Sequence, residues 1–177
     1  MVSSTRKRGR QEMEATSHPP STPAKEHGLL HQIQNMWQFA NLGQYIFTFG
    51  KAVKLDEDLD IEELEMACLQ PGAPKLKEIG LALLKFVSSH RGLTLETFDE
   101  YTRRQYVAKA PHRNVFGNQE EPDHFNDFDI FTKIKVLQQL SIWTFGNADR
   151  IRNLMDEQKD SEQAYWVRTT AFILLLT

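Results

Sequence analysis

The sequence predicts an all-α protein, a small multi-helix bundle that follows a disordered N-terminal tail. After about residue 30, apolar residues recur three and four positions apart, which is the period of an amphipathic helix. Helix start and stop signals accompany this period. Asp60 stands three residues before Glu63, as in a capping box, and Pro71 and Gly72 end the same segment. The single cysteine, Cys68, excludes a disulfide framework.

Composition places the chain among soluble globular proteins of a reducing compartment. Of its 177 residues 40% are hydrophobic and 25% are charged, and the net charge of −3 gives no general affinity for nucleic acid. No apolar run reaches the roughly 18 residues that span a bilayer, and the N-terminus lacks the apolar core of a secretory signal. We therefore expect an intracellular protein without a membrane partner.

Residues 1–28 are predicted to be a disordered basic tail, because Ser, Thr, Pro and charged residues dominate them and few apolar side chains offset the entropy of ordering. The tail contains a short basic cluster. Its nuclear-import candidates are Arg6, Lys7, Arg8 and Arg10. The alternative interpretation is an ordinary basic terminus.

A helix is predicted over about 31–51. One buried stripe at helical spacing supports it, formed by Phe39, Leu42, Ile46, Phe49 and Val53. Trp37 and Tyr45 flank this stripe. The aromatic and β-branched run 45–49 favours a strand instead, but the longer helical period outweighs it.

The acidic segment 60–69 is predicted to be a short helix that docks on its neighbours through Ile61, Leu64 and Cys68, which share one face. Glu62, Glu63 and Glu65 lie in its first turns. We interpret these three carboxylates as candidates for contact with a basic protein partner. The alternative is that they only complement the positive end of the helix dipole.

Two further helices are expected, over 74–88 and from a cap at Thr94 to about 109. The second has core candidates Leu95, Phe98 and Tyr101, and its far end is basic. The cations there are candidates for contact with the DNA backbone: Arg103, Arg104 and Arg113. Cations at a helix C-terminus are also favoured by the dipole alone, so both interpretations stay open.

A polar connector, 111–127, precedes a fifth helix over about 127–143 and a sixth that begins near Asn147. The buried side of the fifth helix is predicted to hold Ile130, Ile134, Leu137 and Ser141. Four cations are placed on the outer faces of these two helices, either to neutralise phosphates or as solvated charge. They are Lys133, Lys135, Arg150 and Arg152.

The order of these elements resembles a known domain family. The segments 58–69 (Asp-Leu-Asp-Ile-Glu-Glu-Leu-Glu-Met-Ala-Cys-Leu) and 93–101 (Leu-Thr-Leu-Glu-Thr-Phe-Asp-Glu-Tyr) are similar to the DDT domain of accessory subunits of ISWI-type chromatin remodellers. Segments 128–140 and 147–155 look like the first WHIM motif, which accompanies that domain. The resemblance covers about 34–156 and includes accessory subunits of the cat eye syndrome critical region and remodelling and spacing factor types.

This resemblance implies a DDT-like region over 31–110, a first WHIM-like motif over 128–156, and a degenerate second WHIM-like segment or an aberrant C-terminus over 157–177. It also implies a nuclear, non-catalytic scaffold that docks onto an ISWI-type remodelling ATPase beside linker DNA or the nucleosome. The alternative is a free-standing DNA-binding transcription regulator.

No catalytic residue, cofactor, metal or small-molecule substrate is predicted. The sequence has no phosphate-binding glycine loop, GxSxG elbow or HExxH motif. Cys68 is interpreted as a core thiol, because no basic residue stands beside it in the sequence to lower its pKa.

Overall fold

The computed structural model describes residues 23–56, 59–88, 90 and 92–159. These residues are all-helical, as predicted, and contain no β-strand. The import candidates Arg6, Lys7, Arg8 and Arg10 and the segment 160–177 lie outside the described residues. In chain order the elements are α1 (Pro23–Gln34), α2 (Trp37–Phe49), α3 (Ile61–Leu69), α4 (Pro74–Ser88), α5 (Phe98–Lys109), η1 (Pro111–Arg113), η2 (Phe125–Asp127), α6 (Ile130–Thr144), η3 (Phe145–Asn147) and α7 (Ala148–Lys159).

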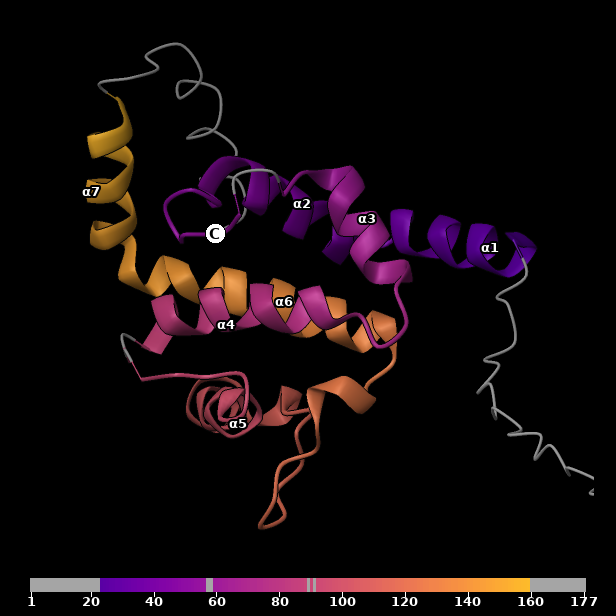
Figure 1. Cartoon of the computed structure of the whole chain (residues 1–177). Helices are drawn as coiled ribbons and strands as arrows, with labels where there is room; N and C mark the ends of the chain where they lie inside the picture. Colours follow the sequence, from indigo (N-terminus) through magenta and orange to yellow (C-terminus); the bar gives the residue numbers. More distant parts are fainter. Residues whose placement is uncertain (1–22, 57–58, 89, 91, 160–177) are drawn as a thin grey trace, which may run out of the picture.

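Helices α4 and α6 lie side by side in the middle of the molecule, as Figure 1 shows. Helix α2 packs on α6 from one side, and α5 packs on α4 from the other. Helix α3 packs on α2 and α4, and α1 packs on α2 and α3. The core fills the space between these layers. Its fully buried side chains include Leu42, Leu64, Leu83, Phe98 and Leu137.

The helix predicted over 31–51 is two helices. α1 ends at Gln34, Met36 is extended, and α2 begins at Trp37. The Asn35 side-chain amide donates a hydrogen bond of 2.7 Å to the His31 carbonyl oxygen, which also accepts from the Asn35 backbone N–H at 3.2 Å. This local side-chain bond competes with continuation of the helix and favours termination there. The predicted buried stripe is correct, since Phe39, Leu42, Ile46, Phe49 and Val53 are all buried. Residues 23–28, predicted to be disordered, belong to α1.

Helix α3 confirms the predicted cap. The Asp60 carboxylate accepts a 2.8 Å hydrogen bond from the Glu63 backbone N–H, and the helix ends before Pro71. Leu64 and Cys68 are buried, at 0% and 4% exposure. Ile61 is 45% exposed, so its predicted place in the core is wrong. As the first residue of α3, it lies over the backbone of α2 rather than between the helices.

The start of α5 also differs from the prediction. Thr97, not Thr94, precedes the helix, because residues 94–97 form a turn in which the two threonine side chains bond to each other's backbone. Leu95 lies in that turn and is 42% exposed, so it is not a core residue.

The connector 111–127 is less polar than its composition suggests, since Phe116 and Phe125 are fully buried.

The last two helices follow the predicted faces. Asp129 caps α6 by accepting from the Thr132 N–H at 2.9 Å and its hydroxyl at 2.7 Å. Ile134, Leu137 and Ser141 are buried, as is Ile151 of α7. Helix α7 continues to Lys159, three residues beyond the boundary expected at 156.

Candidate functional site on helices α2 and α3

The outer side of α2 carries a stripe of largely apolar side chains that face solvent. Trp37, Ala40, Gln44 and Phe47 follow one another at spacings of three, four and three residues, so they share one face of the helix. Trp37 is 64% exposed and Phe47 is 79% exposed. Fully exposed aromatic side chains are unfavourable in water, and contiguous apolar patches on monomers commonly mark interaction sites.

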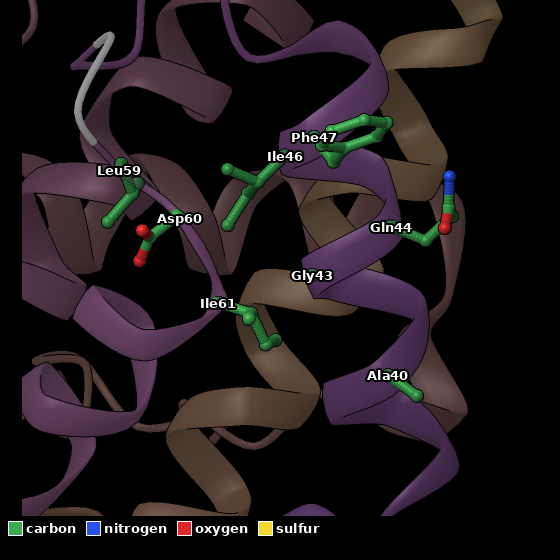
Figure 2. A pocket seen from close by; sticks show the side chains of 8 residues that line it. All are labelled: Ala40, Gly43, Gln44, Ile46, Phe47, Leu59, Asp60 and Ile61. Carbon is green, nitrogen blue, oxygen red and sulfur yellow. The ribbon is translucent and has the colours of Figure 1, made fainter.

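An open hollow of about 340 Å³ lies between this stripe and the start of α3, as Figure 2 shows. Its eight lining residues are Ala40, Gly43, Gln44, Ile46, Phe47, Leu59, Asp60 and Ile61. We call the hollow, together with Trp37, the α2–α3 surface. Six of the lining residues are apolar, and Asp60 supplies the one charge among them.

Gly43 sets the distance between the two helices at this surface. A Cβ atom at position 43 would lie 2.6 Å from Cδ1 of Ile61, well inside van der Waals contact. The glycine therefore lets the Ile61 side chain rest on the backbone of α2. This contact holds the floor of the hollow in place and explains why Ile61 is half exposed.

The three candidate glutamates do not behave alike. Glu62 and Glu63 are exposed in the first turn of α3, and neither forms an ion pair within the described chain. Glu65 is partly buried and accepts a 2.9 Å hydrogen bond from the Gln34 amide of α1. The structure thus leaves two of the three carboxylates available to a partner.

Cys68 lies beneath the same surface, inside the core. Burial raises the pKa of its thiol to about 12, and the nearby Glu65 carboxylate acts in the same direction. The thiol therefore stays protonated at neutral pH, in accord with its interpretation as a packing residue.

Two of the predicted DNA-backbone candidates on α5 contact other parts of the chain. The Arg103 guanidinium donates to the carbonyl oxygens of Gln119 and Glu120, which ties α5 to the connector. Arg104 pairs with Glu100 one turn earlier and lies over the Tyr101 ring, 4.9 Å from its centroid. Arg113, in η1, donates to Gln139 at 3.4 Å.

Lys133 was predicted on the outer face of α6, and this prediction is wrong. The side chain is 4% exposed, and its ammonium donates to the carbonyl oxygens of Gly72 at 3.1 Å and Asn126 at 2.8 Å. Desolvation lowers the pKa of this ammonium. Lys133 joins the α3–α4 turn to η2 and cannot reach a phosphate, whereas Lys135 is exposed as expected.

Arg150 and Arg152 are exposed on α7, as predicted. The Arg150 guanidinium lies 4.3 Å from the centroid of the Phe86 ring, and Arg152 pairs with Asp149 at 3.2 Å. α5 and α7 lie at different ends of the molecule (Figure 1). The predicted cations are therefore distributed over separate helices and not gathered into one patch.

Sequence reasoning missed Phe47 and treated Trp37 as a flank of the core. A signal for both was present. The buried stripe of α2 already accounts for its inner face, so an aromatic residue at 47 falls on the opposite side of the helix.

Comparison with protein-family models, with curated proteins and with solved structures gives no match for this chain. Among the described residues, no group of three His, Cys, Asp or Glu side chains is arranged to hold a metal ion. No helix in the described part of the chain has both the length and the apolar character needed to cross a bilayer.

Proposed function

We propose that this chain is a non-catalytic scaffold of a nuclear chromatin-remodelling complex, which docks onto an ISWI-type ATPase and lies beside linker DNA. The order of sequence motifs that resembles a DDT domain followed by a WHIM motif supports this proposal. A rigid helical platform with an apolar surface open to a partner is the kind of structure that such docking requires.

The observation that carries the docking role is the α2–α3 surface. Two large aromatic side chains, Trp37 and Phe47, stand mostly in solvent on one helix face beside an apolar hollow. Aromatic residues at the centre of an interface contribute most of the binding free energy in many complexes. Covering this surface with a partner would remove both side chains from water.

The contact with linker DNA is the weaker part of the proposal. It depends on cations that remain exposed, of which Lys135 and Arg150 are examples. Such residues neutralise phosphates without reading bases, so the DNA contact would be salt-sensitive and independent of sequence. A free-standing transcription regulator would instead select a defined motif from random duplexes.

The experiment is recovery of the tagged full chain from nuclear extract that has been treated with nuclease, followed by mass spectrometry. We expect an ISWI-type ATPase among the recovered proteins, because the proposed contact is between proteins and does not need DNA as a bridge. Recovery of the chain without any such ATPase would overturn the proposed function.

A further inference from the structure

We propose that the α2–α3 surface binds one amphipathic helix of a partner protein, with Lys or Arg residues along the flank that faces α3. This inference rests on the proposed docking role and names the chemistry of the segment that is docked. It is carried by three features of the surface: its length, its relief and its one-sided charge.

The length of the stripe fits a short helix. From Trp37 to Phe47 the chain advances ten residues, which at 1.5 Å per residue is about 15 Å, or close to three helical turns. A partner helix of about the same length would present apolar side chains at i, i+3 or i+4, and i+7 to the stripe.

The relief of the surface fits the same occupant. The small residues Ala40 and Gly43 form a shallow region in the middle of the α2–α3 surface. Phe47 lies at one end of the hollow, as Figure 2 shows. Trp37 stands one turn before Ala40 on the same helix face. An apolar side chain of the partner can therefore enter between the two aromatic residues, over the Gly43–Ile61 contact.

The negative charge lies on the α3 side, whereas the exposed Lys51 and Lys54 follow the end of α2. Helix α2 has no charged residue, whereas the described residues of 56–65 carry five carboxylates. Within that segment Asp60 lines the hollow, Glu62 is exposed at the second position of α3, and the ion pair of Asp56 with Lys75 offsets one charge. A partner helix with cations toward α3 and neutral residues toward α2 complements this arrangement.

Other occupants fit the charge less well. A second copy of the chain would bring its own uncharged α2 and acidic α3, so a symmetric contact through this surface would supply no cation from either helix to meet Asp60 or Glu62. The apolar run 171–176 of this chain contains no cation to meet Asp60 or Glu62. The charge pattern therefore favours a basic helix from another protein.

The test uses the full chain and a fluorescent synthetic peptide of about fourteen residues, with Leu at helical spacing and Lys along one flank. A matched peptide carries Glu in place of Lys. We expect the Lys peptide to bind in fluorescence anisotropy and the Glu peptide not to bind. Raising NaCl from about 50 to about 500 mM should weaken binding, because the attraction is screened.

Phe47→Asp should weaken binding of the Lys peptide at least about thirtyfold, as expected for a central aromatic contact. Val107→Asp is the matched control, because Val107 is also exposed, at 54%, but lies on α5. It should bind like the unaltered chain. Glu62→Lys should reduce binding of the Lys peptide and permit binding of the Glu peptide. Both Phe47→Asp and Glu62→Lys should keep the melting temperature of the parent chain.

Three results would overturn the inference. They are equal binding of the two peptides, equal effects of Phe47→Asp and Val107→Asp, and a dimer of the full chain that Phe47→Asp dissociates. The proposed function is judged separately. If the ATPase is recovered equally with Phe47→Asp, the function stands and this surface is wrong; if the peptide binds but no ATPase is recovered, the surface stands and the function is wrong.

Discussion

Helix α2 leaves aromatic side chains in solvent, whereas helix α6 buries a lysine. Phe47 is 79% exposed with no described neighbour covering it, and Lys133 is 4% exposed with two carbonyl oxygens around its ammonium. Each residue type is found where its own hydration free energy disfavours it. The lysine is compensated inside the protein by hydrogen bonds. The aromatic residue has no such compensation, so we infer that a partner supplies it.

This difference separates structural exceptions from functional ones. A buried ammonium that donates to two carbonyl oxygens is part of the packing that joins the α3–α4 turn, η2 and α6. An exposed aromatic stripe contributes nothing to packing of this kind. The variants below test whether the two regions respond as this distinction requires.

The largest effect is expected from Leu64→Asp. Leu64 is fully buried, and the substitution places an unpaired charge in the core. We expect a loss of more than about 4 kcal/mol in the free energy of unfolding, enough to unfold the chain. Phe47→Asp introduces the same group on the α2–α3 surface and should change that free energy by less than about 0.5 kcal/mol. Urea unfolding of the pair checks this, and similar losses would refute the assigned faces.

A smaller effect is expected from Lys133→Met. The substitution keeps the apolar stem but removes the donor to the carbonyl oxygens of Gly72 and Asn126, so it should cost about 1–2 kcal/mol. Lys135→Met, two residues on and exposed, is the control and should cost less than about 0.5 kcal/mol. Chemical denaturation curves in which the two variants coincide would show that the hydrogen bonds of Lys133 do not stabilise the fold.

The cap of α6 gives a pH-dependent prediction. Hydrogen bonds from Thr132 lower the pKa of the Asp129 carboxyl below its usual 3.8. Its contribution to stability is therefore complete above pH 3.8 and is lost as pH falls through the lowered pKa. Asp129→Ala should cost about 1 kcal/mol at pH 7, whereas Asp129→Asn should keep the cap and lose this acid sensitivity. Thermal melts from pH 7 to pH 2 distinguish them, and identical profiles for Asn and Asp would contradict the assignment.

The smallest effect on the fold is expected from the double reversal Arg150→Glu and Arg152→Glu. Both side chains are exposed, so melting should shift by at most a few degrees. Binding to a linker duplex at low salt should weaken, with a shallower dependence on salt concentration, because each lost phosphate contact removes about one unit of slope. Unchanged duplex binding would assign both arginines to the solvated surface.

Local signals predicted much of the fold. The cap at Asp60, the stripe of α2 and the buried side of α6 depend on residues close in sequence, so their spacing reveals them, whereas the cap at Asp129 was not predicted. The position of Lys133 could not be predicted, because Gly72 is 61 residues away and only tertiary packing brings its carbonyl near. Gly43 under Ile61 was missed for the same reason. Glu62, Glu63 and Glu65 were proposed from their place in the first turns of the acidic helix, and Asp60 was predicted only as its cap. The apolar part of the candidate site appeared only once α2 and α3 were placed together.

The most direct test of the docking role is photo-crosslinking in a complex with an ISWI-type ATPase. A photoreactive benzoylphenylalanine replaces Phe47 in one sample and Val107 in another, since both positions are exposed but lie on different helices. We expect the probe at position 47 to crosslink to the ATPase and the probe at position 107 to remain uncrosslinked. A crosslink from position 107 with none from position 47 would show that the partner binds elsewhere.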